Sequence, residues 1–201
     1  RLLEKDDKKL HWIGQAEKAC GNASEITSRL ITFARGGDPV LKAVNIAGLI
    51  RNTVDMDNSV SDLPVECSIQ LEMPPVLADE RQISQVIRNL LENAREATAS
   101  GGSISVRYAM ASEEAARKAG LGKGAYVHLT VTDTGAGIEP DVIGKIFDPY
   151  FSTKNMGSQK GQGLGLTVCH SIVKNHEGVI WAESVPGEET VFSVLLPVAA
   201  D

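Results

Sequence analysis

The sequence predicts a layered α/β domain preceded by one long N-terminal helix. Between residues 10 and 34, apolar and small side chains recur at spacings of three and four, which is typical of a helix in a bundle. From Val40 onward the spacing alternates between about two and about 3.6 residues, which indicates strands and helices packed in layers. The chain has 201 residues, of which 42% are hydrophobic and 23% charged, so it is large enough to bury a core.

The helix and strand signals follow one another in a clear order. The N-terminal helix is expected to end at Gly36, Gly37 and Pro39, and to pack either in a bundle or on the domain that follows. Asn45 and Asp79 are suited to cap the next two helices. Helices are expected at residues 45–56, 79–99, 142–147 and 164–175, strands at 65–71, 103–108, 126–132, 179–184 and 190–196, a surface helix within 111–123 and a polar loop at 155–161.

Composition argues against several classes of protein. A net charge of −6 disfavours nucleic acid as a partner, because phosphate binding needs clustered Lys and Arg. Cys20, Cys67 and Cys169 are widely spaced, so neither a disulfide framework nor a zinc site is expected, and a cytoplasmic location fits. No stretch approaches the ~18 apolar residues of a membrane span, so we expect no membrane contact by this chain. Because it begins with Arg1, we expect a piece of a longer protein, which upstream segments could anchor to a membrane.

Four polar or glycine-rich clusters occur in one order along the domain. They lie at residues 89–94 (NLLENA), 133–138 (DTGAGI), 147–154 (FDPYFSTK) and 161–166 (GQGLGL). In the first cluster, Asn89 and Asn93 are four residues apart, so both amides project from one helix face. An amide oxygen is a neutral, hard ligand that can hold Mg²⁺ beside phosphates. Two solvated asparagines are the alternative interpretation.

The second cluster places a carboxylate at the end of a strand. Asp133 could accept a hydrogen bond from an exocyclic amine such as that of adenine, and Gly135 and Gly137 would let the backbone approach a ligand. The alternative is a tight turn that uses Asp and Gly for geometry alone.

The fourth cluster opens a helix with glycines. Unpaired N–H groups at a helix start form an anion site, so Gly161, Gly163 and Gly165 indicate phosphate binding, with Lys154 and Lys160 within reach. The Rossmann fingerprint fails because Leu166 stands where it requires glycine, and a P-loop motif is absent. A plain flexible loop is the alternative.

Together the four clusters resemble, in order and spacing, the nucleotide-binding boxes of the GHKL ATPase superfamily, and specifically the ATP-binding domain of sensor histidine kinases. Residues 44–197 carry this resemblance, and residues 25–37 resemble the second helix of the dimerisation and histidine-phosphotransfer hairpin. It implies a two-layer α/β sandwich of the GHKL or Bergerat type, with a mixed, mainly antiparallel sheet and helices on one face. The nucleotide would lie between the helices at 79–99 and 164–175. The implied domains are a hairpin remnant at 1–37, a linker at 38–44 and a catalytic domain at 45–198.

The resemblance also implies ligands and residue roles. ATP or ADP would bind with Mg²⁺; Asn93 would be the metal ligand, Asn89 would face the phosphates, and both would be catalytic. Asp133 would bind the adenine amine. The other implied nucleotide-binding residues are Ala97, Gly135, Gly137, Ile138, Ile146, Phe147, Lys154, Lys160, Gly161, Gly163, Leu164, Gly165, Leu166 and Thr190. Thr190 matches an element that supports the adenine through water, although Glu189 stands where the family usually has Gly.

A phosphoacceptor of the usual kind is not evident in the chain. Kinases of this family phosphorylate a histidine that is followed by an acidic residue on the first hairpin helix. His11 precedes Trp12, while His128, His170 and His176 fall in a strand, in the helix after the fourth cluster and in a turn. We therefore expect the acceptor upstream of Arg1, and a chain that binds ATP without labelling itself.

Three functions compete at this stage. The favoured one is the catalytic portion of a sensor histidine kinase, which dimerises through the hairpin and supplies phosphate to a response-regulator receiver domain. The second is a GHKL ATPase clamp, which would carry Glu at the position of Asn89; since an amide cannot accept a proton, hydrolysis is disfavoured. The third is a non-catalytic nucleotide-sensing or dimerisation module.

Overall fold

A computed structural model describes Trp12, Gly14, Gln15 and residues 38–99, 101–149, 151 and 164–199. The chain divides into two units, residues 1–37 and 38–201. In the first unit the three described residues are helical. The rest of the predicted N-terminal helix lies outside the described residues, as do the polar loop at 155–161 and Lys154, Lys160, Gly161 and Gly163.

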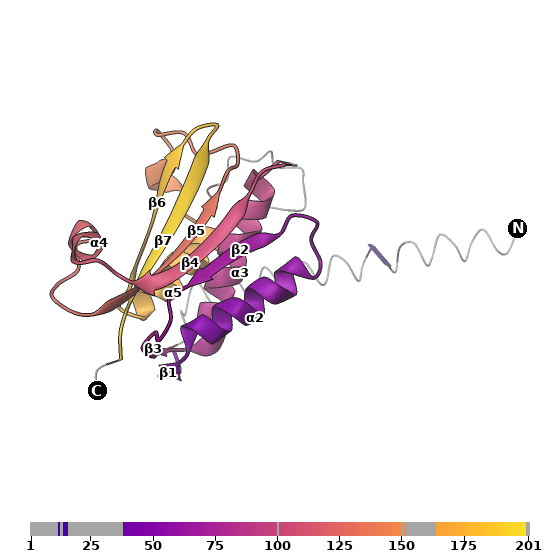
Figure 1. Cartoon of the computed structure of the whole chain (residues 1–201). Coiled ribbons are helices and arrows are strands. Elements are labelled where there is room, and N and C mark those ends of the chain that lie inside the picture. The colour runs from indigo at the N-terminus through magenta and orange to yellow at the C-terminus, as the bar shows by residue number, and fades with distance from the viewer. Residues whose placement is uncertain are drawn as a thin grey trace, which may run out of the picture. The chain divides into compact units, whose positions relative to one another are not determined.

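The second unit is built on a five-stranded sheet (Figure 1). The strand order is β2 (Val65–Ile69), β4 (Ile104–Met110), β5 (Tyr126–Asp133), β7 (Glu189–Pro197) and β6 (Val179–Val185). Only β2 and β4 run parallel among these neighbours, so the sheet is mixed and mainly antiparallel, as predicted. A separate ladder of β1 (Lys42–Val44) and β3 (Val76–Ala78) was not predicted, because three-residue strands are too short to show an alternation.

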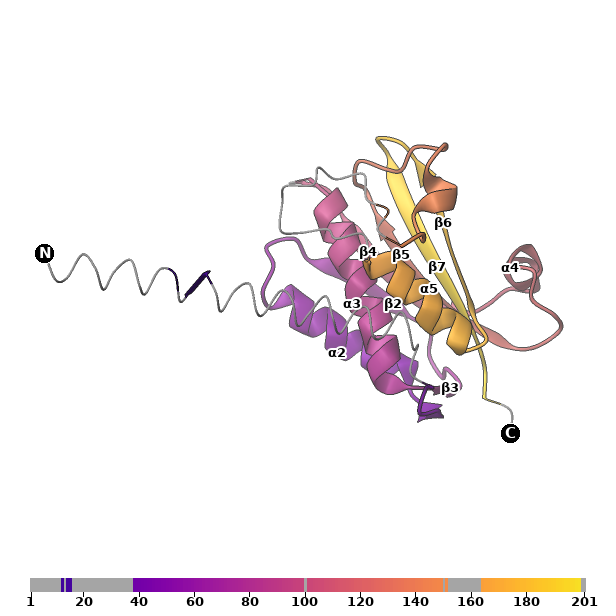
Figure 2. The same cartoon turned by 180° about the vertical axis from the view of Figure 1, so that it is seen from behind.

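Three helices pack on one face of the sheet (Figure 2). They are α2 (Ile46–Asn58), α3 (Glu80–Ala97) and α5 (Gly165–Asn175). The predicted caps are confirmed: the Asn45 side chain accepts from Gly48 N, and that of Asp79 accepts from Arg81 N and Gln82 N. The predicted apolar face of α3 is also confirmed as core, since its residues are at most 2% exposed: Ile83, Val86, Ile87, Leu90, Leu91 and Ala94. None of the described helices is long and apolar enough to cross a bilayer.

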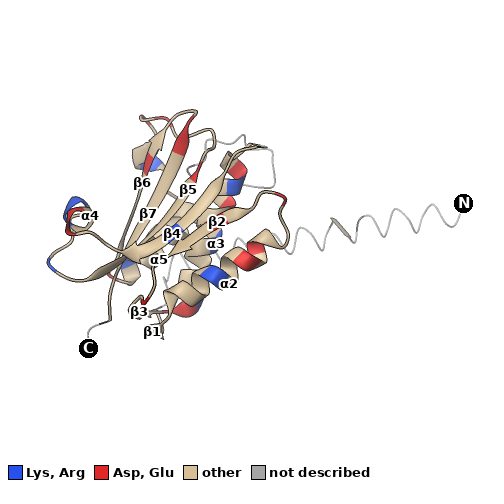
Figure 3. Cartoon of the chain, viewed as in Figure 1, with Lys and Arg blue, Asp and Glu red and all other residues tan. Residues whose placement is uncertain are grey.

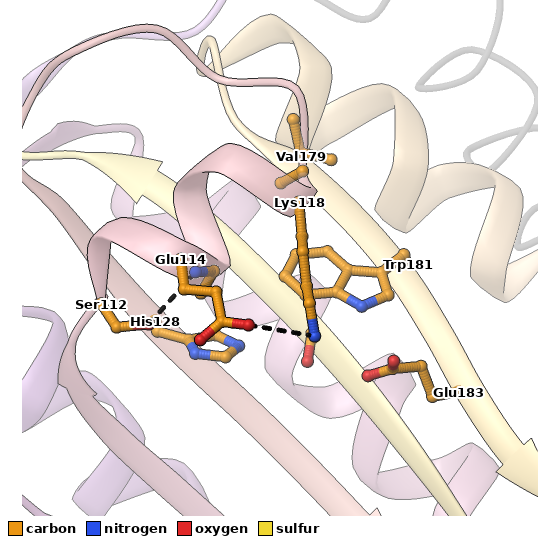
Figure 4. A pocket seen from close by; sticks show the side chains of 10 residues that line it. Ser112, Glu114, Lys118, His128, Val179, Trp181 and Glu183 are labelled. Atoms are coloured by element: carbon orange, nitrogen blue, oxygen red, sulfur yellow. Dashed lines mark hydrogen bonds and ion pairs between the residues drawn. The ribbon is translucent and has the colours of Figure 1, made fainter.

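A short helix, α4 (Glu113–Lys118), forms within the predicted insert and is capped by Ser112. Acidic and basic residues are interspersed on its surface and on that of α2 (Figure 3). Together with outward-facing residues of β5 and β6, α4 encloses a hollow of about 610 Å³ whose walls include His128 and Trp181 (Figure 4). Because these two side chains alternate with core residues along their strands, the hollow lies on the sheet face opposite to α3 and α5.

The expected helix at 142–147 is reduced to a single 3₁₀ turn, η1 (Ile143–Lys145). At the end of α5, the imidazole of His176 is buried and connects two helices. Its Nδ1 lies 2.8 Å from the carbonyl oxygen of Ile172, and its Nε2 accepts from Asp79 N at 2.9 Å. Because Nε2 accepts, the ring proton resides on Nδ1.

The guanidinium of Arg95 connects α3 to the last turn of α2 and to the segment between α2 and β2. It donates to the Asp57 carboxylate from Nε at 2.8 Å and also from Nη2, and to Ser61 Oγ and the Leu63 carbonyl oxygen from Nη1. The Arg95 and Asp57 side chains are mostly buried, so this charge-assisted network is shielded from water.

Arg95→Met is expected to lower the free energy of unfolding by about 2 kcal/mol, because it leaves the mostly buried Asp57 carboxylate without its donor. Urea unfolding of the nucleotide-free chain measures this. Arg88→Met is the matched control, since Arg88 is exposed on the same helix, and it is expected to change stability by less than about 0.5 kcal/mol. Equal effects of the two substitutions would contradict the role of the network.

Candidate functional site

Three polar side chains lie side by side on the core face at one end of the sheet. Asp133 at the end of β5 is directly opposite Thr190 on β7, and Thr190 is opposite Ser184 on β6. Asp133 and Thr190 are 1% and 2% exposed. The sequence singled out both of these, but Ser184 was missed, because only the β6–β7 register places it beside Thr190.

Burial dominates the electrostatics of Asp133. One carboxylate oxygen, Oδ1, accepts from Gly135 N at 3.0 Å. Removal from water raises the pKa of Asp133 from its ordinary value of 3.8 to about 6, although the Gly135 N–H acts in the opposite direction. The group is therefore ionised at neutral pH, and it is a buried acceptor without a cation beside it among its described contacts.

The two glycines after Asp133 are required by packing within the protein. A Cβ on Gly135 would lie 2.5 Å from the Ala97 carbonyl oxygen at the end of α3. Gly137 has a φ of +72°, and a Cβ there would lie 2.6 Å from the Val185 carbonyl oxygen. The geometry of a tight turn therefore explains, at least in part, why glycines stand at these two positions. The contact of Gly135, Gly137 and Ile138 with a base remains a prediction.

The loop that contains these glycines is anchored on both sides. Ala136 N donates to the Ala97 carbonyl oxygen at 3.1 Å, and Gly187 N donates to the Ala136 carbonyl oxygen at 2.8 Å. Ile138 N donates to Ser184 Oγ at 2.9 Å. The loop is consequently held between the end of α3 and the β6–β7 hairpin.

Asn89 joins α3 to the first turn of α5. Its Nδ2 donates to the Gly165 carbonyl oxygen at 3.2 Å. The buried thiol of Cys169 donates to the Val86 carbonyl oxygen at 3.8 Å, and burial raises its pKa to about 12. The Asn89 amide therefore has a structural partner in Gly165. Its predicted position beside phosphates stays a prediction.

Asn93 lies one turn further along α3, toward Ala97. Its Nδ2 is buried and has no hydrogen-bond partner within the described part of the chain. Since the two ends of an amide are exchanged by a simple flip, the side chain can offer either its oxygen or its nitrogen to a ligand. No group of three His, Cys, Asp or Glu side chains in that part could hold a metal ion. Mg²⁺ commonly takes few protein ligands and binds phosphates and water besides, so a single amide such as that of Asn93 is chemically suited to it. The assignment of Asn93 to the metal stays a prediction.

The start of α5 differs from the starts of the other described α-helices. Asn45, Asp79 and Ser112 cap α2, α3 and α4 with side-chain hydrogen bonds, whereas Leu164 provides none for α5. The first turn of α5 therefore lacks the side-chain cap that α2, α3 and α4 have.

Among the described residues, little packs against Gly165 at the start of α5. The nearest described atom to a Cβ placed on Gly165 would be Asn89 Cγ at 3.9 Å, so packing in that part of the chain does not explain the glycine. Leu164 is buried and Leu166 packs against the core.

The segment before residues 152–163 is attached to the domain by two apolar residues. Ile146 is buried, and Phe147 packs against the core with its ring 5.8 Å from that of His170 on α5. These residues were expected to anchor a lid over the nucleotide. Their packing is compatible with that role, while Lys154, Lys160, Gly161 and Gly163 lie outside the described residues.

Comparison with protein families decides the classification. Residues 78–200 match the family described as histidine kinase-, DNA gyrase B- and HSP90-like ATPases. The chain belongs to this ATPase family. The match contains all four sequence clusters, α3, α5 and four strands of the main sheet.

Individual members of this ATPase family give a consistent comparison. The chain is 32% identical over 186 residues to the sensor histidine kinase ZraS of Salmonella typhi, covering 91% of this chain and 37% of that protein. It is 40% identical over 139 residues to the sensor kinase CckA of Brucella abortus, covering 68% of this chain and 14% of that one. The chain thus spans little more than a third of the first relative and less of the second.

A solved structure agrees with this fold. The crystal structure of full-length ShkA in complex with AMPPNP superposes with a TM-score of 0.75 at 24% identity, covering 93% of this chain and 38% of that chain. The catalytic domain of the histidine kinase ThkA superposes with a TM-score of 0.62 at 28% identity, covering 79% of this chain and 95% of that chain, which confirms the predicted two-layer sandwich as the fold of such domains.

Proposed function

We propose that this chain is the ATP-binding catalytic portion of a sensor histidine kinase, which transfers the γ-phosphoryl group of ATP to a histidine on a helix upstream of Arg1. The main support for this proposal is the order in which three residues of α3 lie along the helix. Ala97 contacts the loop after Asp133, Asn93 lies one turn away, and Asn89 contacts the start of α5. With a rise of about 1.5 Å per residue, Ala97 and Asn89 are about 12 Å apart, a separation that one nucleotide can span.

The groups near the Ala97 end of α3 are suited to bind the adenine of ATP, and those near the Asn89 end are suited to bind its phosphates. Asp133 and Thr190 are buried acceptors for the exocyclic amine of adenine. Asn93 would ligate Mg²⁺, which neutralises phosphate charge when it is bound. The first N–H groups of α5, with Lys154, Lys160, Gly161 and Gly163, would hold the phosphates.

The chemistry of Asn89 favours phosphotransfer over hydrolysis. An amide has no basic site that could take a proton from water, and its nitrogen already donates to Gly165. This supports a kinase rather than an ATPase clamp.

Two of the three described histidines support an acceptor outside this chain. His176 is 3% exposed, and both ring nitrogens have backbone partners. The Nε2 atom of His128 is buried, and its ring stacks on that of Trp181 on the outer face of the sheet. The third, His170, is exposed on α5 but is followed by Ser171 rather than by an acidic residue. In the whole protein, the hairpin would form a homodimer, the phosphate would pass to a receiver-domain aspartate, and this portion would work in the cytoplasm, where ATP is present.

Incubation of this chain with Mg²⁺ and γ-labelled ATP is expected to leave it unlabelled, because it lacks the acceptor helix. Addition of the complete hairpin from the full-length protein is expected to produce acid-labile label on the hairpin, as phosphohistidine is. Label on His11 would contradict the acceptor argument. Steady phosphate release without any acceptor would favour the ATPase clamp instead.

A further inference from the structure

The hydroxyl of Ser184 lies at the centre of a three-partner hydrogen-bond network beside Asp133 and Thr190. It donates to the Glu189 carbonyl oxygen at 2.8 Å and accepts from Ile138 N at 2.9 Å. Its third partner is Thr190 Oγ1 at 3.0 Å. Ser184 therefore connects the β6–β7 hairpin to the loop that follows Asp133.

Counting hydrogens determines the direction of the third bond. A serine hydroxyl has one hydrogen to donate and two lone pairs that accept. The hydrogen is used on Glu189, and one lone pair is used by Ile138 N–H. Thr190 must therefore donate its own hydroxyl hydrogen to the remaining lone pair of Ser184, which leaves only lone pairs on Thr190 for a ligand.

We propose that Ser184 is a positioning residue that determines the preference of the site for adenine, by holding the Thr190 hydroxyl as a pure acceptor. This rests on the proposed function. Beside the ionised Asp133, Thr190 then completes a row of acceptors across β5 and β7. The exocyclic amine of adenine supplies N–H donors to such a row, whereas guanine presents a carbonyl oxygen at the same ring position and would place one acceptor against another.

A water molecule that bridges Asp133 and Thr190 would likewise present only hydrogen-bond acceptors to the base. A water held between Asp133 and Thr190 must donate both of its hydrogens to them, so it too offers only lone pairs to the base. Without the Ser184 hydroxyl, Thr190 could rotate its hydrogen toward a ligand and donate to a carbonyl oxygen. The preference for adenine over guanine would then fall.

The test compares ATP and GTP affinities, measured with Mg²⁺ by calorimetry, for the wild-type chain and its variants. Ser184→Ala is expected to lower the ATP-over-GTP preference by about 3- to 10-fold, the equivalent of one neutral hydrogen bond. Ser184→Thr keeps a hydroxyl in a strand position and is expected to retain the preference. A merely structural role would weaken both nucleotides equally, and that result would overturn the inference.

Thr190→Val provides a second test that does not require the Ser184 variant to fold. If Ser184 acts through Thr190, Thr190→Val alone must lower the preference, and adding Ser184→Ala must not lower it further. An undiminished preference in Thr190→Val would overturn the inference. Failure of the wild-type chain to bind ATP would overturn the proposed function and the inference with it, so the two failures are distinguishable.

Discussion

Asp133→Asn is expected to weaken ATP binding about 10- to 150-fold while it stabilises the nucleotide-free fold. If Asp133 binds the adenine amine as proposed, the substitution replaces an acceptor-only carboxylate with an amide that presents N–H to that amine, which removes a charge-assisted hydrogen bond of roughly 1.5–3 kcal/mol. ATP should lose its advantage over GTP. The nucleotide-free fold gains stability because the substitution removes an ionised carboxylate that is buried without a cation among its described contacts. The raised pKa of Asp133, about 6, reflects this burial.

The stability gain has a defined pH dependence. A carboxyl whose folded pKa is raised from 3.8 to about 6 favours the folded state below pH 4, and this contribution is lost as the pH rises through 6. Urea unfolding should therefore show wild type and Asp133→Asn converging near pH 4. Above pH 6 the variant should be more stable by about 1–3 kcal/mol. Asp141→Asn, at an exposed position, is the matched control and should change neither stability nor affinity.

Adenosine affinity provides a further check, because adenosine has no phosphates that titrate. Wild-type affinity should fall as the pH drops below about 6, where Asp133 becomes protonated, whereas the affinity of Asp133→Asn should stay flat. Parallel pH profiles for the two proteins would show that Asp133 is not the group that contacts the base.

Asn93→Ala is expected to reduce phosphotransfer to a supplied hairpin by about 100-fold or more, because it removes the proposed protein ligand of the metal that would neutralise phosphate charge. ATP affinity should become insensitive to Mg²⁺, while adenosine should bind nearly as before. The fold should tolerate the change, since the Asn93 amide nitrogen has no hydrogen-bond partner in the described part of the chain.

Measurements of ATP affinity with Mg²⁺ and with a chelator separate the metal effect from general damage. Asn52→Ala, exposed on α2, is the matched control and should leave both affinities unchanged. Equal losses of adenosine and ATP in Asn93→Ala would mean that the variant is unfolding, and the assignment of Asn93 to the metal would fail.

Local signals sufficed for much of the fold. The six apolar residues on one face of α3 and the caps Asn45 and Asp79 were predictable, because helix periodicity and capping depend on neighbours within a few residues. The alternation along β5 was predictable for the same reason. The candidate nucleotide residues came from motifs that are short in sequence.

Contacts between residues far apart in the sequence decided the features of the fold that local signals did not predict. The β1–β3 ladder joins strands of three residues that lie more than thirty positions apart, so neither strand carries a signal of its own. Gly135 and Gly137 serve contacts with Ala97 and Val185, which only the folded chain brings near.

Within the site, residue types were readable from the sequence, but their partners were not. The sequence identified Asp133 and Thr190 as candidate adenine-binding residues. The raised pKa of Asp133, by contrast, arises from burial that exists only once the helices and the sheet have packed together. Ser184 became visible only when the register of β6 on β7 placed its hydroxyl against Thr190. The sequence by itself determined the longer helices and strands and the chemical groups of the site. The tertiary structure decided which groups share a hydrogen bond, because such bonds depend on separations in space that no local pattern records.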